Sequence, residues 1–540
     1  MTPDKVLQNK QKHAPPTDFE SYGFIEKLLE IHSKHPDLTA IQILESGRTL
    51  TYSQLVELIE KLKSVFISLN LYVGDRVVLQ LPPCPEMIAS FYALASLGII
   101  AVPLSPGLTE YETLQILEDC KPLGIVAISG TRQFYPFQFV LEVENPLSSS
   151  GKMPLEPQKI QTVPQKSLTP TPAHTKFFSL VQLFNQLQDS SPKTPLGPPC
   201  GNVHVSCHYT YKGLGYPLGA LHRYHEYSAC SAGMMQEFRQ EVGAVHFVGL
   251  PIYPVYGLTA CVLTPLAFGC KLILTNKTSE LDLVTLLEEH QVQFATLVPF
   301  VLERLIHGAL IHKKSRALRF HPDLMLVSGG SYLEPALSAT ALEVLGHEPY
   351  QGYGLSETLP LTGNHPTAFQ RGSLGVPLCK NTQIAIMGND GQELPAGQGG
   401  EIAVRGPSIM EGYYGRPRET AKFFRKGWFH TGDLGILDET GFLQFLGRRI
   451  PITKIASQMV DLTEIEWVIQ KHPEVARVRA IIRCDKKKGK EFVAASIVLK
   501  QGSKIGTTEI KQLCQQRLSS HKIPRSFKFF RQRLVVETVV

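Results

Sequence analysis

Three short segments of the chain carry the side chains that a nucleotide-binding site needs. In Gln351–Thr358 a tyrosine lies between two glycines and is followed by a serine and a glutamate, and further along Asp433 and Arg448 each follow a glycine. A flat ring can stack on adenine, carboxylates can accept hydrogen bonds from ribose hydroxyls or hold magnesium, and a guanidinium can bind phosphate. These residue types predict a nucleotide-binding site.

Within the first segment we predict separate roles for neighbouring residues. Gly352, Tyr353 and Gly354 would form the adenine platform, Glu357 is the candidate catalytic carboxylate that faces the metal ion, and Ser356 offers a hydroxyl to phosphate. Two structural alternatives stay open from the residues alone. Ser356 could cap a helix that starts at this turn, and Tyr353 could be a core aromatic residue.

The order and spacing of these segments resemble the adenylate-forming superfamily, which includes acyl-CoA synthetases, peptide-synthetase adenylation domains and luciferases. Between Glu357 and Asp433 lie Gly400–Gly406 and Gly412–Tyr414, in the order in which that family has them. The resemblance runs from about residue 49 to residue 525. It implies that Asp433 binds the ribose hydroxyls.

The resemblance also implies roles for two residues of the C-terminal part. Arg448, at the start of a lid domain, would contact ribose or phosphate. Lys454 matches the catalytic lysine of the loop that enters the site during the thioester-forming step.

The activity that the resemblance implies is the ATP-dependent activation of a carboxylic acid as acyl-AMP, followed by transfer to a thiol. The implied cofactors are ATP, Mg²⁺ held by Glu357, and coenzyme A or a phosphopantetheinyl carrier protein. The implied partners are a small carboxylic acid and an acyl carrier protein as one possible acceptor. Because the enzyme must align two anions and neutralise their charge, positioning and electrostatics dominate this chemistry.

Two segments are expected to line the acid pocket. Relatives that bind amino acids carry an aspartate near the first of them, and residues 251–256 contain none, so an apolar fatty or aryl acid is favoured. The expected pocket residues are Tyr253, Val255, Tyr256, Ser328 and Gly329, and the neighbouring Gly330 is assigned to the nucleotide.

The segment Thr210–Gly219 keeps only the frame of the family's phosphate loop, T-S-G-T-T-G-x-P-K-G. Gly213 and Gly215 can still bring backbone N–H groups to phosphate. Tyr211 replaces the serine, however, and Leu218 replaces the lysine. The alternative is a loop that keeps its shape but no longer binds triphosphate.

Two further features of the sequence bear on whether this chain still binds triphosphate and catalyses adenylation: nearby cations and a missing C-terminal lysine. Lys212 or Arg223 could supply the lost charge from a new direction. The family follows the segment here read as Lys522–Arg525 with a lysine-containing motif, whereas this chain continues Leu534–Val540 without one. The loss of one preorganised charged donor costs about 10²–10³ in rate.

A third departure concerns the hinge of the lid domain. The expected hinge residue is Ile450, followed by Pro451, and proline fixes φ, so rotation here is expected to be stiffer than usual.

Three functions therefore stay open: a complete ligase, which is favoured, a catalytically impaired AMP-binding protein, and a partial catalyst of the thioester step alone.

The elements that must position these residues follow an α/β pattern. Strand-like and helical segments alternate from about residue 22 to residue 128 and again from residue 241 to residue 384, which predicts layered parallel sheets with helices on their faces. Short strands and glycine turns from Gln383 to Leu446 predict a small β-rich subdomain. From about residue 134 to residue 199 an irregular excursion is expected, interrupted by one helix-like segment, Phe177–Leu187.

We predict a flexible N-terminus over residues 1–21, a large N-terminal adenylation domain over 22–446 and a small α+β C-terminal lid domain over 447–540. The 540 residues, 43% of them hydrophobic, carry a net charge of +6, and the densest basic run, Lys486–Lys490, fits a turn better than a nucleic-acid site. Ten scattered cysteines, no zinc spacing, no secretory signal and no membrane span predict a cytoplasmic protein. The oligomeric state stays open.

Overall fold

The computed structural model describes residues 23–129, 135, 137–144, 176–180, 195–449, 452–455, 458–485, 490–500 and 502–531. Several sequence predictions lie outside these residues. They are the flexible N-terminus 1–21, the hinge Ile450–Pro451, the basic turn at 486–489 and the C-terminal end Leu534–Val540.

The first of two large sheets has eight strands and mixed direction. Its strands from β4 to β7 run parallel, whereas β8 and β9 form an antiparallel hairpin at one side. In spatial order the strands are β19 (Gly412–Tyr413), β9 (Pro217–Arg223), β8 (His204–Tyr211), β4 (Ile100–Pro103), β3 (Arg76–Gln80), β5 (Gly124–Ile128), β6 (Phe139–Val143) and β7 (Lys176–Ser179).

The second large sheet has nine strands, and its centre is parallel. Since the carboxyl ends of parallel strands lie at one edge, the loops that follow β10, β12, β13 and β14 are brought together there. The spatial order is β16 (Val376–Pro377), β15 (Leu359–Gly363), β14 (Pro349–Leu355), β13 (Met325–Ser328), β12 (Phe294–Leu297), β10 (Val245–Val248), β11 (Lys271–Leu274), β1 (Thr39–Ile43) and β2 (Thr49–Thr51).

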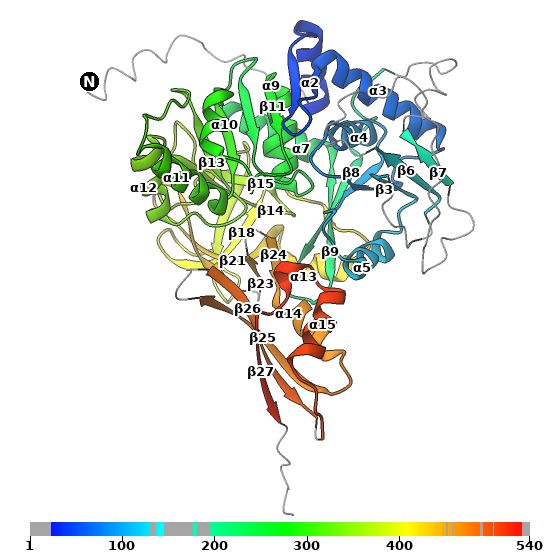
Figure 1. Cartoon of the computed structure of the whole chain (residues 1–540), viewed down its shortest axis with the longest axis vertical. Coiled ribbons are helices and arrows are strands. Elements are labelled where there is room, and N and C mark those ends of the chain that lie inside the picture. Colours follow the sequence, from blue (N-terminus) through cyan, green and yellow to red (C-terminus); the bar gives the residue numbers. More distant parts are fainter. Residues whose placement is uncertain are drawn as a thin grey trace, which may run out of the picture.

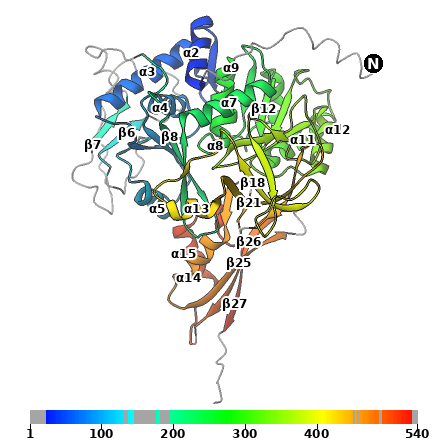
Figure 2. The same ribbon diagram turned by 180° about the vertical axis from the view of Figure 1, so that it is seen from behind.

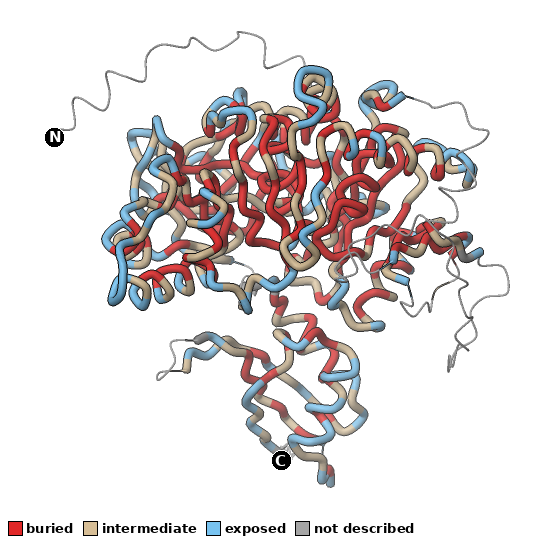
Figure 3. Tube along the Cα trace, turned by 45° about the horizontal axis from the view of Figure 1, so that its top comes forward, coloured by how far each residue is buried: buried red, intermediate tan, exposed pale blue. Residues whose placement is uncertain are grey.

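Helices fill the space between the two sheets and cover their outer faces (Figures 1 and 2). All twelve residues of α4 are buried, because that helix is apolar over most of its surface, and Figure 3 shows the resulting buried interior. The inner layer contains α2 (Phe24–Lys34), α3 (Tyr52–Ser68), α4 (Pro85–Ser96), α7 (Tyr224–Glu237), α8 (Val255–Leu258), η2 (Thr259–Leu263) and α9 (Thr264–Phe268).

The outer helices pack on the opposite faces. Residues of α5 (Glu110–Cys120) form a core cluster with the eight-stranded sheet, and α10 (Leu283–Glu289), α11 (Pro299–His312) and α12 (Pro335–Leu345) form another with the nine-stranded sheet. None of the described helices is long and apolar enough to cross a membrane.

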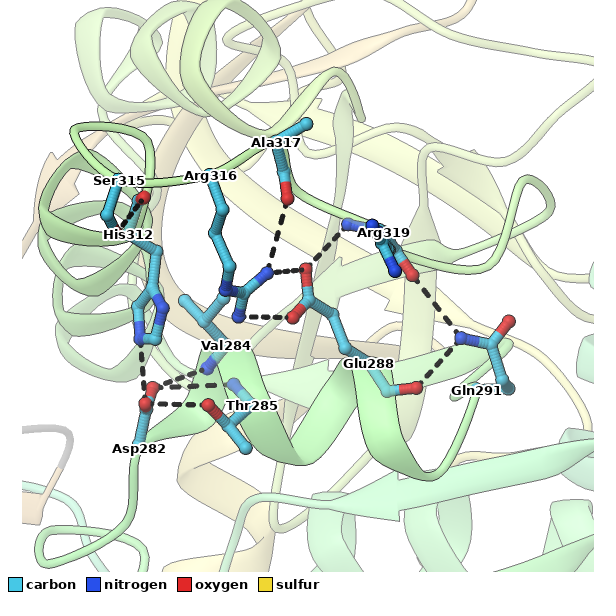
Figure 4. Close-up of polar contacts among 10 residues, drawn as sticks. All are labelled: Asp282, Val284, Thr285, Glu288, Gln291, His312, Ser315, Arg316, Ala317 and Arg319. Carbon is cyan, nitrogen blue, oxygen red and sulfur yellow. Dashed lines mark hydrogen bonds and ion pairs between the residues drawn. The ribbon is translucent and has the colours of Figure 1, made fainter.

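A polar network joins the start of α10 to the segment after α11 (Figure 4). Asp282 caps α10 by accepting the Val284 N–H at 3.1 Å, and its carboxylate also lies 2.7 Å from His312 Nε2. At the other end of α10, Arg316 forms a two-pronged ion pair with Glu288, at 2.9 and 2.6 Å. These contacts fix the outer helices relative to each other.

The predicted small β-rich part is present as a five-stranded sheet in which β21 pairs with β18, β20 and β22. Its strands are β17 (Gln383–Met387), β18 (Gly399–Arg405), β20 (Phe424–Arg425), β21 (Trp428–Leu437) and β22 (Leu443–Arg448), with α13 (Pro417–Phe423) beside them.

The C-terminal domain lies below the large domain in Figure 1. A hairpin of β23 (Ile452–Ile455) and β24 (Gln458–Asp461) leads into α14 (Leu462–Gln470), whose apolar side packs on a three-stranded sheet. That sheet contains β25 (Val475–Asp485), β26 (Lys490–Leu499) and β27 (Ser526–Arg531), accompanied by α15 (Thr507–Arg517) and η3 (Ser520–Lys522).

The predicted fold class, layered α/β sheets with a small β-rich part and a small C-terminal domain, is confirmed. One element differs from the prediction. The expected helix Phe177–Leu187 begins as a strand, because Lys176–Ser179 pairs in parallel with Phe139–Glu142. Its backbone satisfies sheet hydrogen bonds there, and residues 181–194 lie outside the described part.

Candidate active site

A cavity of about 920 Å³ opens where the carboxyl ends of the nine-stranded sheet meet the β8–β9 hairpin, β21 and the C-terminal domain. Most of the predicted site residues line it, although they come from distant parts of the chain. These residues are Tyr253, Val255, Tyr256, Gly330, Gly352, Tyr353, Gly354, Ser356, Glu357, Asp433 and Arg448.

Asp433 forms the polar end of the cavity with Tyr353 and Arg448, which the sequence analysis assigned to the same nucleotide-binding site. The Tyr353 hydroxyl donates to Asp433 Oδ2 at 2.9 Å, and Arg448 Nε lies 3.3 Å from Asp433 Oδ1. Asp433 and Arg448 are register partners on β21 and β22, so the sheet itself sets their distance. Burial and the Asp433 carboxylate raise the pKa of the Tyr353 phenol well above its ordinary value.

This geometry suits ribose recognition. A carboxylate offers about four acceptor positions, so Asp433 can serve Tyr353 and Arg448 and still accept from ribose hydroxyls. The Tyr353 ring lines the cavity beside Gly352 and Gly354. Gly354 is required by the hairpin, because a Cβ there would lie 2.2 Å from the Leu359 carbonyl oxygen.

Ser356 and Glu357 lie in the turn between β14 and β15, so the helix-capping alternative for Ser356 is wrong: no helix starts at this turn. Sheet pairing on both sides forces the chain to reverse within three residues. Buried His222 fixes the turn from behind, with Nε2 2.6 Å from the Ser356 carbonyl oxygen and Nδ1 2.9 Å from Glu226.

Glu357 is almost fully buried and its Oε1 atom has two partners. The Tyr413 hydroxyl donates to it at 2.7 Å, and the Lys212 ammonium lies 3.1 Å away. Lys212 also donates to the carbonyl oxygen of Thr431 at 3.1 Å. Lys212, one of the two candidate cations, therefore reaches the site.

As arranged, the Oε1 atom of this carboxylate does not fit as a ligand of the expected Mg²⁺. Magnesium requires near-octahedral oxygen ligands, whereas an ammonium and a phenol hydroxyl already lie on Oε1 of Glu357. In the described part of the chain, no group of three or more histidine, cysteine, aspartate or glutamate side chains could hold a metal ion.

The central part of the phosphate loop, residues 212–216, connects β8 to β9. Gly213 and Gly215 have φ of 71° and 81°, which glycine adopts without strain. Neither lines the cavity among the described residues. Instead, the Gly213 N–H donates to Asp461 Oδ2 of the C-terminal domain at 3.1 Å. Burial raises the pKa of Asp461, while backbone hydrogen bonds from Thr463 and Gly215 partly oppose this shift.

Neither the substituted position Leu218 nor the candidate cation Arg223 brings a positive charge to the cavity. Leu218 is fully buried in a cluster with Leu361 and Phe429, so its position faces the core. Arg223, the second candidate cation, pairs with Glu411 at 2.5 Å and is not among the residues that line the cavity in the described part.

Tyr211, which replaces the family's serine, takes part in a buried contact between the domains. Its hydroxyl donates to Glu464 at 2.8 Å, and the Lys522 ammonium lies 4.5 Å from its ring centre. Lys522 also pairs with Glu464 at 2.8 Å and with Glu112 of α5 at 2.6 Å. The Lys522–Glu112 pair therefore holds the C-terminal domain against α5, and the Tyr211–Glu464 hydrogen bond holds it against the end of β8.

The pKa values of the three charged groups in this contact are shifted in different directions. Burial acts to raise the pKa of Glu112, but Lys522 and Ser519 outweigh it, so the pKa is lowered. Burial raises the pKa of Glu464, and Lys522 only partly opposes it. Burial acts to lower the pKa of Lys522, yet the two carboxylates raise it.

The acid end of the cavity is mostly apolar. Gly329 packs against the Tyr256 ring, where a Cβ would lie 2.5 Å from Cζ, and neither it nor buried Ser328 is among the lining residues of the described part. Beside Tyr253, Val255 and Tyr256, the lining side chains include Met234, Phe238, Leu250, Val298, Leu359 and Leu378.

Of Lys454, the structure describes the backbone alone: it pairs with Met459 in the β23–β24 hairpin. Gln458 at the tip of that hairpin lines the cavity, so the hairpin reaches the site.

The partners of site residues that were not predicted include Asp461, Glu464, Glu112 and Tyr413. Tyr413 belongs to a glycine–tyrosine motif that was visible in the sequence. Asp461 was visible only as an N-cap preceding α14, which is a structural signal.

The fold and the cavity can now be compared with known protein families. The family described as "AMP-binding enzyme" matches residues 29–414, and the family "AMP-binding enzyme C-terminal domain" matches residues 464–536. This chain belongs to the AMP-binding enzyme family.

The relatives agree on the reaction class. A long-chain-fatty-acid–CoA ligase of Bacillus subtilis is 28% identical over 93% of this chain and 90% of its own length. A fatty acid–[acyl-carrier-protein] ligase of Streptomyces coeruleorubidus is 27% identical over 92% and 91%. The predicted class, an acid–thiol ligase, is confirmed.

Among solved structures, o-succinylbenzoate CoA synthetase from Bacillus subtilis, bound with a product analogue, superposes with a TM-score of 0.75. It is 23% identical and the match covers 94% of this chain and 95% of that chain. At this identity the likeness concerns the fold.

Proposed function

We propose that this chain activates an apolar fatty or aryl acid as acyl-AMP, using ATP, and transfers the acyl group to coenzyme A or to an acyl carrier protein. The observation that carries the proposal is the single cavity, which joins an apolar end at Tyr256 to a ribose-binding end at Asp433. An acyl adenylate needs both ends in one space.

The residue roles form part of this proposal. Tyr353, with Gly352 and Gly354, binds adenine, Asp433 and Arg448 bind ribose and phosphate, and the Ser356–Glu357 turn faces the reacting phosphate. Lys454 is proposed to act in the thioester step. The domain division at residue 446, the cytoplasmic location and the carrier protein as alternative acceptor are proposed on the sequence patterns and the relatives.

A second candidate function is catalysis of the thioester step alone. It is favoured by the phosphate loop, because the Gly213 N–H that would bind triphosphate is bonded to Asp461. In the same arrangement, Gln458 of the β23–β24 hairpin lies at the cavity, as a thioester-forming conformation requires.

Acid-dependent exchange between pyrophosphate and ATP separates the two candidates, since it reports adenylate formation alone. We expect exchange with one or more apolar acids in a panel of fatty and aryl acids. Absence of exchange, together with thioester formation from a supplied acyl-AMP, would replace the first function by the second. If neither reaction occurs, both proposals are wrong.

A further inference from the structure

We propose that the Lys212 ammonium occupies the place of a divalent metal ion at Glu357, so that this chain neutralises nucleotide phosphate with a built-in cation. The inference rests on the nucleotide site proposed above. It concerns a residue that stands where the family's phosphate loop has glycine.

Described residues of the site surround the Lys212 side chain. Its side chain is 5% exposed and that of Glu357 is 1% exposed, with 3.1 Å between ammonium and carboxylate. The rings of Phe423 and Phe429 have their centres 5.5 and 5.3 Å from the ammonium, and both ring faces attract a cation. The Thr431 carbonyl oxygen accepts a further hydrogen bond at 3.1 Å.

This environment selects an ammonium over a metal ion. A strongly hydrated Mg²⁺ would need several oxygen ligands, whereas two aromatic rings supply none. The buried pair is also strongly coupled, because removing one partner leaves an uncompensated charge away from water. At the Oε1 atom of Glu357 a metal ion could bind only if the Lys212 ammonium left.

The ammonium is also placed to act on a ligand. Lys212 lines the cavity together with Thr431, Gly432 and Asp433, the residues at its ribose-binding end. An ammonium has three N–H donors, and Glu357 and Thr431 take two of them among the described residues. The third is available to a phosphate oxygen, which is the contact that a bridging metal ion would otherwise make.

The test is a Mn²⁺ titration read by electron paramagnetic resonance, in the presence of saturating AMP, which itself binds the metal weakly. We expect no Mn²⁺ site in the wild-type chain. The variant Lys212→Gly, which restores the family's residue, should bind one Mn²⁺ per chain, and Lys212→Gly with Glu357→Gln should bind none. A wild-type Mn²⁺ site that Glu357→Gln abolishes would overturn the proposal.

A second measurement stands if Lys212→Gly does not fold. Calorimetry of ATP binding to the wild-type chain should give the same affinity with Mg²⁺ as with EDTA. A loss in EDTA of about tenfold or more, the size of one charge-assisted hydrogen bond, would contradict the proposal. In the Mn²⁺ titration, Lys314→Met, which removes an exposed lysine outside the lining residues, is the matched control for lost charge.

Failure of this inference is distinguishable from failure of the proposed function. If AMP does not stabilise the wild-type chain against heat, the nucleotide site itself is wrong. If AMP stabilises the chain and Mn²⁺ binds at Glu357 in the wild type, only the role of Lys212 is wrong.

Discussion

Asp433 is held in place from two sides. Tyr353 and Arg448 contact different oxygens of its carboxylate, and the β21–β22 register fixes the distance to Arg448. The three residues were predictable because each lies in a short motif. The Lys212–Glu357 pair was not predictable, because the two residues come from different sheets and the sequence around a charged residue does not identify its partner.

We expect Asp433→Asn to weaken AMP binding by about 10- to 100-fold, since hydrogen bonds to a charged group contribute about 1.5–3 kcal/mol. The measurement is the rise in melting temperature with AMP concentration. Asp438→Asn, in the turn of the same hairpin and outside the lining residues, is the control. Equal AMP responses of the two variants would contradict the ribose role.

At the scale of elements, helix termini perform two different tasks. Asp282 caps α10 in the outer layer, and Asp461 caps α14 while it also binds the phosphate loop. Local pattern predicts the caps themselves. It does not predict the second contact of Asp461, because that contact depends on how the C-terminal domain docks. The same limit explains Phe177–Leu187, where tertiary strand pairing with β6 overrides a helical pattern.

The double role of Asp461 has a measurable consequence. Asp461→Asn can still accept the Thr463 N–H, yet it removes a negative charge that competes with phosphate at Gly213. We expect ATP to bind more tightly to this variant, by about tenfold. Asp282→Asn, which changes a comparable cap far from the cavity, should leave ATP affinity unchanged. Equal effects would show that Asp461 does not obstruct the loop.

The Glu288–Arg316 pair predicts a pH dependence of stability that is separate from the site (Figure 4). The hydrogen bond from Arg316 lowers the pKa of Glu288 from the ordinary value 4.5. The stabilisation is therefore present above pH 4.5 and is lost as the pH falls through the lowered pKa.

We expect Arg316→Met to lower the melting temperature slightly at pH 7 and to match the wild type once Glu288 is protonated. Lys313→Met, an exposed neighbour, serves as the control for loss of charge. A difference between Arg316→Met and wild type that grows as the pH falls would contradict the sign of this prediction.

At the scale of the whole molecule, the C-terminal domain closes one side of the cavity. Lys522 binds carboxylates of both domains, and Ser519, Ser520 and His521 line the cavity beside it. Layered sheets and the small C-terminal domain were predictable from alternating patterns. The docked arrangement was not, because it depends on buried charges whose sequence positions are far apart.

We expect Lys522→Met to release this domain, because it leaves Glu112 and Glu464 without their shared cation, and breaking such buried pairs costs about 3–5 kcal/mol. Small-angle scattering should report a larger radius of gyration, and protease should cleave near residue 450. Lys528→Met, exposed on β27, should do neither. An unchanged radius for Lys522→Met would show that apolar contacts suffice for docking.

The central claim is that one cavity joins adenosine to an apolar acid and delivers the acyl group to a thiol. The most direct measurement is mass spectrometry of thioesters after incubation with ATP, an acid panel, and coenzyme A or a holo-acyl carrier protein. We predict an acyl thioester of an apolar acid with the wild-type chain and none with Asp433→Ala. A wild-type chain that forms no thioester with any acid or acceptor, although AMP stabilises it, would contradict the account.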